Sequence, residues 1–299
     1  MTRIAFIGLG NMGGPMAANL VKAGHAVAGF DLAPASLDAA RQAGVAVAAS
    51  AREAAAEAEV VVTMLPAGRH VVSVWSDLLD AVRPGTLLVD SSTIDVDSAR
   101  RAHALAEARG CASLDAPVSG GVGGASAGTL TFMCGGAEAA FSRAEPVLSR
   151  MGRKVVHCGG AGAGQAAKIC NNMMLAITMI GVSEGFLLAQ RLGLDWDKLW
   201  AITSTATAQS WALSSYCPAP GVVPTAPSNR DYAPGFMAAL MLKDVNLSQA
   251  AAEATGTPTP LGAHAAALYR QLVDAGEGAR DFSVIFRWLD GQARAPADG

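Results

Sequence analysis

Short apolar runs alternate with helical patterns through the first half of the chain. Between the early runs, apolar residues recur with helical period, as in Pro15–Lys22, Ser36–Gln42 and Ser98–Ala108. Strands that alternate with helices in this way predict an α/β domain with a parallel, doubly wound sheet. The predicted strands are Ile4–Ile7, Val27–Phe30, Val60–Met64, Leu87–Asp90, Ser113–Ala116, Thr129–Cys134 and Lys154–His157.

The pattern changes after the glycine-rich stretch Gly159–Gly164. A long helical pattern runs from about Ala163 to Leu192, and no clear strand follows it. Prolines crowd the segment from Cys217 to Pro234, which predicts an irregular loop before helical periodicity resumes. We therefore expect two domains, a sheet domain at 1–162 and an all-helical domain at 163–299.

Composition narrows the class of protein. Hydrophobic residues make up 51% of the 299 residues and charged residues 16%, which suits well-packed cores and excludes disorder. The formal net charge of -3 gives no electrostatic reason to bind nucleic acid or an anionic membrane. The apolar run Met173–Leu188 is shorter than a bilayer requires and contains Glu184, so it predicts a buried helix and no membrane span.

Thiols and the first residues bear on the compartment. The five cysteines show no close pairing and no metal-ligand spacing, so we expect small buried thiols in a reducing compartment. The chain enters a strand pattern directly after Met1, without the features of a signal or transit peptide, and we expect a cytoplasmic protein. The five histidines do not cluster, so neither a metal site nor a Ser-His-Asp arrangement is predicted.

A glycine motif, G-x-G-x-x-G, lies between the first predicted strand and the first predicted helix. Gly8 and Gly10 would permit a tight turn and a close approach of a pyrophosphate, and Gly13 would let helix and strand pack closely. The helix N-terminus adds positive potential for the phosphates. In this context the motif predicts a Rossmann-type dinucleotide site. Its predicted cofactor contacts are Gly8, Leu9, Gly10, Asn11, Met12 and Gly13.

Asp31 ends the next predicted strand, 18 residues after Gly13. There a carboxylate can accept hydrogen bonds from ribose hydroxyls. The following residues, Leu32–Ala35, include no Lys or Arg to meet a 2′-phosphate, which Asp31 would also repel. The sequence therefore favours NAD over NADP.

Three further loops follow predicted strands. Met64–Pro66 and Asp90–Thr93 should border the cofactor, because ligands collect at the carboxyl ends of strands in open α/β sheets, although each loop alone is also typical of a helix-capping turn. Ser119 offers a hydroxyl, and Gly120 and Gly121 offer unobstructed backbone N–H groups, a combination that can bind a carboxylate without an arginine. A flexible surface turn is the alternative for this third loop.

Lys168 and Asn172 are four residues apart on the predicted long helix, so they share one face. The apolar residues among 166–170 would desolvate the lysine ammonium, which favours the neutral amine that a general base requires. Asn172 could hold a substrate hydroxyl or orient the lysine. The spacing leaves equally open a lysine that extends from the helix to solvent. On a later helix, Lys243-Asp244 is typical of a surface ion pair.

These motifs, in this order, resemble those of the β-hydroxyacid dehydrogenases, and most closely the 3-hydroxyisobutyrate dehydrogenases among them. The resemblance covers nearly the whole chain and its motifs are highly specific, while Tyr216–Gly221 and Asp281–Ser283 favour the hydroxyisobutyrate branch. The matching segments are Gly8–Leu20 (GLGNMGGPMAANL), Asp90–Asp95 (DSSTID), Asp115–Val122 (DAPVSGGV), Gly162–Asn172 (GAGQAAKICNN) and Leu242–Asp244.

The resemblance implies an oxidoreductase that uses NAD to oxidise 3-hydroxyisobutyrate to methylmalonate semialdehyde, as in valine degradation, and that forms a homodimer or homotetramer through its helical domain. It implies that Lys168 is catalytic. The implied substrate contacts are Ser119, Gly120, Gly121 and Asn172, and the further cofactor contacts are Leu65, Pro66, Thr93 and Lys243.

Two alternatives stay open. A related enzyme of the same family would act on tartronate semialdehyde, succinic semialdehyde or serine. A non-catalytic NAD-binding sensor is the alternative from another class of protein. The pair Lys168 and Asn172 argues against the sensor, because a sensor has no need of a proton-transfer residue.

Overall fold

The computed structural model describes residues 1–294 of the chain. It divides into two compact units, the first covering Met1–Lys168 and the second beginning at Ile169. The division falls within one helix, α8 (Ala163–Arg191), which begins in the first unit and continues into the second. The domain boundary expected from the sequence, between residues 162 and 163, coincides with the start of this helix.

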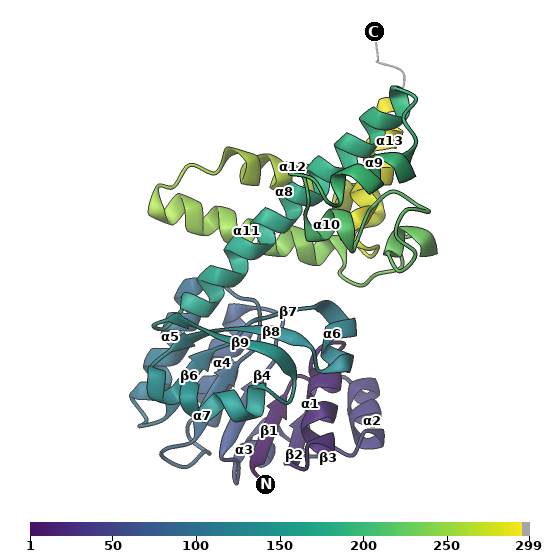
Figure 1. Cartoon of the computed structure of the whole chain (residues 1–299). Helices are drawn as coiled ribbons and strands as arrows, with labels where there is room; N and C mark the ends of the chain where they lie inside the picture. Colours follow the sequence, from purple (N-terminus) through teal and green to yellow (C-terminus); the bar gives the residue numbers. More distant parts are fainter. Residues whose placement is uncertain (295–299) are drawn as a thin grey trace. The chain divides into compact units, whose positions relative to one another are not determined.

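A single sheet forms the centre of the first unit. Its order is β3-β2-β1-β4-β5-β6-β8-β7, with β9 paired to β8, and β3 through β6 are all parallel (Figure 1). This confirms the Rossmann-type doubly wound fold. The strands are Arg3–Ile7 (β1), Ala26–Phe30 (β2), Ala46–Val47 (β3), Val60–Thr63 (β4), Leu87–Asp90 (β5), Ala112–Asp115 (β6), Val118–Ser119 (β7), Leu130–Gly136 (β8) and Gly152–Gly159 (β9).

The expectation of a wholly parallel sheet is wrong at the end of the sheet that contains β7, β8 and β9. β8 runs antiparallel to both β6 and β7, whereas β9 is parallel to β8. The pattern of alternating strands and helices gave no sign of this reversal, because a helix, α6, still separates β7 from β8 in the chain. β3 and β7 were missed as well, since two residues are too few to show a hydrophobic period.

Helices cover both faces of the sheet (Figure 1). One core cluster packs α1, α2, α6 and α7 on one face, and a second packs α3, α4 and α5 on the other. All four residues of β4 and of β5 are buried, as expected for strands with no solvent face. The helices are Gly13–Lys22 (α1), Pro34–Gln42 (α2), Ala51–Ala55 (α3), Gly68–Leu78 (α4), Val96–Glu107 (α5), Gly121–Ala127 (α6) and Glu138–Leu148 (α7).

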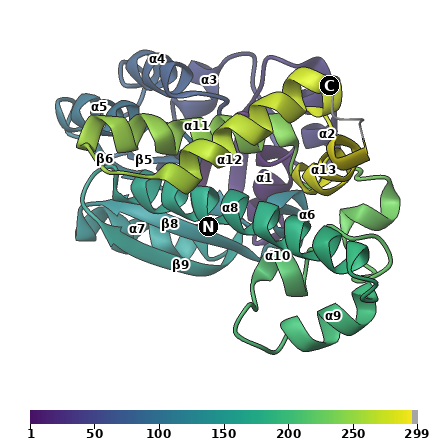
Figure 2. The same ribbon diagram turned by 90° about the horizontal axis from the view of Figure 1, so that it is seen from above.

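The second unit is helical, as predicted. α11 and α12 run side by side (Figure 2), and Met241, Tyr269 and Phe282 are fully buried in its main core. Its elements after α8 are Trp196–Thr203 (α9), Trp211–Ser214 (α10), Pro227–Arg230 (η1), Ala238–Thr255 (α11), Pro260–Leu272 (α12), Val273–Glu277 (η2), Phe282–Val284 (η3) and Ile285–Arg294 (α13).

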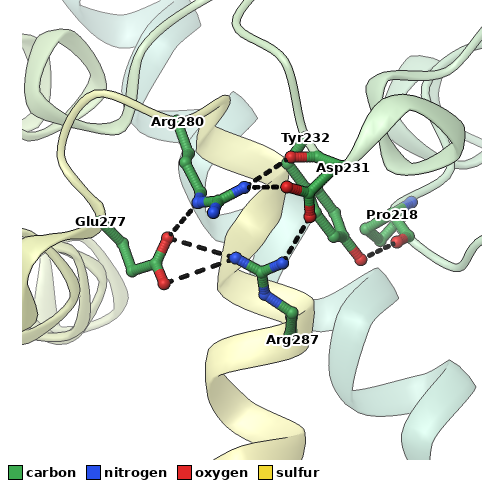
Figure 3. A network of polar contacts seen from close by, with 6 residues as sticks. All are labelled: Pro218, Asp231, Tyr232, Glu277, Arg280 and Arg287. Carbon is green, nitrogen blue, oxygen red and sulfur yellow. Dashed lines mark hydrogen bonds and ion pairs between the residues drawn. The ribbon is translucent and has the colours of Figure 1, made fainter.

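The proline-rich segment from Cys217 to Pro234 is irregular apart from the short η1 turn, and side chains fix its end (Figure 3). Asp231 and Tyr232 both adopt left-handed backbone angles, with φ of 49° and 55°. The Asp231 carboxylate forms ion pairs with Arg280 and Arg287, and each Nη1 lies 2.7 Å from a carboxylate oxygen. These two guanidinium groups hold the pKa of Asp231 below its usual range. The network accounts for a strained turn that the proline pattern alone did not predict.

α8 confirms the long helix predicted from about Ala163 to Leu192, and it extends beyond the apolar run Met173–Leu188 at both ends. By length and composition it could cross a membrane, with 29 residues and a mean hydropathy of 1.5 in its most apolar window, of which 39% is buried. A core helix of a globular protein meets the same criteria. The prediction of a buried helix holds for Ala176 and Met179 but is wrong for Met174 and Leu188, which are exposed.

The cysteines are all free thiols. Cys111, Cys134 and Cys217 are buried, and burial raises the pKa of Cys134 to about 12, so this thiol stays protonated and unreactive. Cys158 and Cys170 are exposed, so the prediction of five buried thiols is wrong at these two positions.

Candidate active site

The glycine motif forms the tight turn that its spacing predicts. Gly8 has a φ of +94°, and a Cβ there would lie 2.2 Å from the Met64 carbonyl oxygen. A Cβ at Gly13 would lie 1.9 Å from the Gly8 carbonyl oxygen, so helix α1 can begin here only with glycine. A Cβ at Gly10 would meet nothing within 4 Å. The turn thus leaves Gly10 open above a helix N-terminus, and this arrangement fits a pyrophosphate.

Asp31, just past β2, is tied to the glycine turn. Its Oδ2 accepts a hydrogen bond from the Leu9 N–H at 2.6 Å, and its Oδ1 accepts one from the Ala33 N–H at 2.8 Å. Each carboxylate oxygen keeps a second lone pair, so ribose hydroxyls can still donate to it. The next residue, Leu32, is uncharged and 90% exposed, so this position provides no cation for a 2′-phosphate. The geometry suits the dinucleotide ribose that the sequence placed here.

The loops after β4 and β5 are joined by a buried polar chain. The Leu65 N–H donates to Ser92 Oγ at 2.7 Å, and the Ser92 hydroxyl donates to Asp90 Oδ1 at 2.6 Å. Thr63 donates to the same carboxylate oxygen at 2.7 Å. The chain fixes the backbone of two predicted cofactor loops, those of Leu65-Pro66 and Thr93. Sequence reasoning placed Ser92 and Asp90 in a loop that borders the cofactor but did not predict these hydrogen bonds, because a hydrogen bond between two loops leaves no periodic signal.

Burial makes the Asp90 carboxyl a weaker acid than usual. Burial raises the pKa of Asp90 to about 6, and the hydrogen bonds from Ser92 and Thr63 oppose that rise. Among the described residues, no group hydrogen-bonds its second oxygen, Oδ2. A protonated Oδ2 is therefore the favoured form of this carboxyl in mildly acidic solution.

The Asp90 carboxyl should make stability depend on pH. Its pKa is raised in the folded chain, so its contribution is complete below pH 4 and is lost as pH rises through about 6. Between pH 5 and pH 8 this loss is on the order of 1 kcal/mol of unfolding free energy. Asp90→Asn should reduce the wild-type difference between these two pH values by that amount in urea unfolding. Equal pH dependence in the two proteins would show that Asp90 does not carry the effect.

The predicted carboxylate loop spans β7 and the start of α6. Gly120 and Gly121 have φ values of +135° and +60°, and a Cβ at Gly120 would lie 3.0 Å from the Leu130 side chain. Ser119 is half-buried beside them. The first N–H groups of α6 have no partner within the helix, so they are available to an anion. The positive φ values explain the two glycines structurally, whether or not a ligand binds.

Lys168 is buried, with 7% of its surface exposed, in the second turn of α8. The turn before it is anchored by Gln165, which is fully buried. The Gln165 amide donates to the Ser92 carbonyl oxygen at 2.8 Å and accepts from the Ile94 N–H at 3.1 Å. Residues three apart lie on the same side of a helix, so Gln165 fixes the face that carries Lys168. The burial agrees with the apolar surroundings expected for this lysine.

Asn172, four residues further along α8, belongs to the second unit and is 2% exposed. Its Nδ2 donates to Asp244 Oδ2 at 2.6 Å, and its Oδ1 accepts from Asn171 at 2.9 Å. Lys243 Nζ lies 3.3 Å from Asp244 Oδ1. The ion pair expected from the sequence is present, but Asp244 is buried, so its description as a surface pair is wrong. Sequence reasoning did not connect Asp244 with Asn172, and the structure shows that contact.

One histidine makes contacts that the sequence did not predict. Ser113, His103 and Asp115 form a hydrogen-bonded chain in the first unit, although no Ser-His-Asp arrangement was predicted. His103 and Asp115 are twelve residues apart, and only the return of the chain from α5 into β6 brings them together. Within residues 1–294, no group of three or more His, Cys, Asp or Glu is arranged to hold a metal ion.

Two family models match consecutive parts of the chain. Residues 3–160 match the NAD binding domain of 6-phosphogluconate dehydrogenase. Residues 162–289 match the NAD-binding domain of NADP-dependent 3-hydroxyisobutyrate dehydrogenase. Together they assign both parts of the chain to dinucleotide-dependent dehydrogenases.

Full-length relatives narrow the family. A probable 3-hydroxyisobutyrate dehydrogenase of Mycobacterium bovis is 54% identical, over 99% of this chain and 100% of the relative. An NAD-dependent L-serine dehydrogenase of Pseudomonas aeruginosa is 50% identical, over 97% of this chain and 98% of the relative. The solved structure of Mycobacterium tuberculosis 3-hydroxyisobutyrate dehydrogenase with L-serine superposes with a TM-score of 0.93 at 55% identity, covering 97% of this chain and 99% of the other. The chain therefore belongs to the 3-hydroxyisobutyrate dehydrogenase family of oxidoreductases.

Proposed function

We propose that this chain is an NAD-dependent dehydrogenase that oxidises 3-hydroxyisobutyrate to methylmalonate semialdehyde, with Lys168 as the proton acceptor. The observation that carries the proposal is the placement of Lys168. It is a buried lysine on the helix whose first turn is fixed, through Gln165, to the loop that follows β5. A lysine on a helix turn that is fixed in this way has a defined backbone position before substrate arrives, which favours a role as general base.

Different residues have different proposed roles in the reaction. Lys168, in its neutral form, would take the proton of the substrate hydroxyl, and Asn172 would hold that hydroxyl. Ser119 and the N–H groups of Gly120 and Gly121 would bind the substrate carboxylate. Bound NAD supplies the redox chemistry by accepting the hydride from the carbon that carries the hydroxyl.

Asp31 should set the choice of cofactor. Its carboxylate lies against the glycine turn, where the ribose would bind, so wild-type protein should turn over faster with NAD than with NADP at equal, subsaturating concentrations. Asp31→Asn combined with Leu32→Arg should shift the ratio of kcat/KM values toward NADP, because a cation then replaces an anion. Asp38→Asn, at an exposed carboxylate on α2, is the matched control and should leave the ratio unchanged. A wild-type preference for NADP would contradict this assignment.

L-serine is the second candidate substrate. The Pseudomonas aeruginosa relative is named for its action on L-serine, and the solved Mycobacterium tuberculosis structure was determined with it. Serine and 3-hydroxyisobutyrate share a carboxylate and a C3 hydroxyl, but serine carries an ammonium where the other carries a methyl group. A site that binds the methyl group offers the ammonium no hydrogen-bond acceptor, so the two substrates should differ in kcat/KM.

The deciding experiment compares substrates directly. Initial rates of NADH formation should be measured for 3-hydroxyisobutyrate and L-serine. Initial rates of NADH consumption should be measured for tartronate semialdehyde and succinic semialdehyde. The highest kcat/KM with 3-hydroxyisobutyrate is the result expected here. A higher value for another member of the panel would replace the substrate and keep the family chemistry. No turnover of any member, with NADH still bound, would favour the non-catalytic sensor.

We also propose a cytoplasmic homodimer or homotetramer that assembles through the helical unit and acts in valine degradation. Large apolar side chains of this unit remain exposed in the single chain, and a second copy would remove them from water. Light scattering gives the mass that tests the assembly. The exposed side chains are Met174, Leu188, Leu192, Leu194, Ile202, Trp211, Leu240 and Leu261.

A further inference from the structure

Asp115, at the end of β6, is a buried carboxylate that none of the roles above uses. It is 1% exposed, and both of its oxygens are engaged by the start of α8. Oδ1 accepts a hydrogen bond from the Gly162 N–H, and Oδ2 accepts one from the Gln165 N–H, each at 2.8 Å. A helix start leaves its first N–H groups without partners, and here a side chain some fifty residues earlier in the chain supplies the acceptors.

The contact between Asp115 and α8 leaves no room for adjustment. A Cβ at Gly164 would lie 2.3 Å from the Met133 carbonyl oxygen and 2.8 Å from Asp115 Oδ2. A Cβ at Gly135 would lie 2.5 Å from Asp115 Oδ1. Glycine on both sides lets the helix approach the strands this closely. The carboxylate is therefore enclosed by backbone, and the helix start has one position against it.

His103 also contacts the Asp115 carboxylate. Its Nε2 lies 2.9 Å from Asp115 Oδ1, and its Nδ1 lies 2.7 Å from Ser113 Oγ. A carboxylate can only accept, so Nε2 carries the proton, and Nδ1 in the neutral ring accepts from the serine hydroxyl. Ser113 is buried, and Asp115 is hydrogen-bonded to the start of α8. These three hydrogen-bonded side chains therefore orient a helix and do not form a hydrolytic triad.

We propose that Asp115, oriented by His103, is a positioning residue that sets the place of Lys168 by fixing the first turn of α8. The proposal rests on the function proposed above for Lys168. Gln165, which donates to Asp115, precedes Lys168 by three residues, about 4.5 Å along the helix axis. A helix segment this short is rigid, so a displacement at Asp115 reaches Lys168 undiminished.

Asp115→Asn tests the proposal. The asparagine amide nitrogen would face one of the two helix N–H groups, donor against donor, and displace the helix start. Because misplacement of a reacting group by 1 Å can cost about 10²-fold, we expect kcat to fall about 10- to 100-fold. The KM for NAD and the affinity for NADH should stay near wild type. The deuterium isotope effect on kcat, measured with 3,3-dideuterated L-serine or 3-hydroxyisobutyrate, should increase as the chemical step becomes rate-limiting.

Asp195→Asn is the matched control. Asp195 caps α9 in the same way, with Oδ1 accepting the N–H groups of Asp197 and Lys198 at 3.0 and 3.2 Å. It lies in the second unit, among no residues assigned to substrate or cofactor. The asparagine oxygen can still accept both N–H groups, so this variant should keep the wild-type kcat and isotope effect with little change in thermal stability. A purely structural role for Asp115 would lower the thermal stability of Asp115→Asn but leave its kcat and isotope effect at the wild-type values, and the proposal would then be wrong.

Two milder variants keep the test decisive if Asp115→Asn does not fold. His103→Phe removes the ring nitrogen that donates to Asp115, and His103→Gln restores a donor. The first should lower kcat and raise the isotope effect, and the second should recover most of the wild-type values. Equal kcat values in both variants and in wild type would overturn the proposal.

Lys168→Ala, measured in parallel, separates this inference from the proposed function. A fully active alanine variant would mean that Lys168 is not the base, and the proposed function of this residue would fail whatever Asp115→Asn does. Loss of activity in Lys168→Ala together with a wild-type kcat in folded Asp115→Asn would overturn the positioning role alone.

Discussion

Replacing Lys168 with alanine should lower kcat by about 10²–10⁴-fold, the range for the loss of a general acid or base. Without the amine, the hydroxyl proton has no oriented acceptor as the substrate is oxidised. The affinity for NADH should be unchanged, because the glycine turn and Asp31 are built from other elements, β1, α1 and β2. Steady-state rates and a fluorescence titration with NADH measure the two effects separately.

Two companion measurements identify the missing group as a base. Lys168→Arg should be nearly as impaired as the alanine variant, because a guanidinium stays protonated and cannot accept a proton. Added ethylamine should restore part of the activity of Lys168→Ala in proportion to its neutral fraction. The wild-type kcat for oxidation should rise with pH as the amine loses its proton. Near-normal kcat in the folded alanine variant would falsify the assignment, and the base would have to lie elsewhere.

The local geometry of the predicted cofactor end could be derived from the sequence, because it depends on residues that are close together in the chain or on adjacent parallel strands. Gly8 and Gly13 occupy fixed offsets within one strand-turn-helix unit, and the structure gives each a steric reason to be glycine. Asp31 ends the adjacent parallel strand, so the topology alone places it beside the turn. Local spacing and parallel pairing together determine this half of the arrangement.

The groups that support Lys168 and Asn172 could not be predicted in this way. Asp115 reaches Gln165 across 50 residues, and Asn172 reaches Asp244 across 72. Such contacts depend on how the elements pack, and the sequence around Asp115 or Asp244 reads only as a strand end or a helical ion pair. The antiparallel strand β8 escaped prediction for the same reason, because its direction is decided by pairing with β6 and β7.

Asp244 carries the second large expected effect, because it fixes the rotamer of Asn172. The asparagine amide has two ends, and each is committed: Oδ1 accepts from Asn171, and Nδ2 donates to Asp244 at 2.6 Å. Asp244→Ala would leave Nδ2 buried without its acceptor, at a cost of about 1–3 kcal/mol, or release the side chain to rotate. If Asn172 holds the substrate hydroxyl, either outcome displaces the reacting group, and we expect kcat to fall about 10²-fold.

A comparison with Asp244→Asn separates the two partners of this carboxylate. The asparagine oxygen can still accept from Asn172, so most of the wild-type kcat should return. The ion pair between Lys243 and Asp244, which is 3.3 Å long in the wild-type chain, is lost. If Lys243 contacts the cofactor, the KM for NAD should change in both variants, and kcat should collapse only in the alanine variant. Asp274→Ala, at an exposed position in the same unit, is the control for a lost aspartate and should match wild type. Equal kcat values in Asp244→Ala and Asp244→Asn would mean that the orientation of Asn172 does not limit the reaction, and the substrate hydroxyl would then be held by another group.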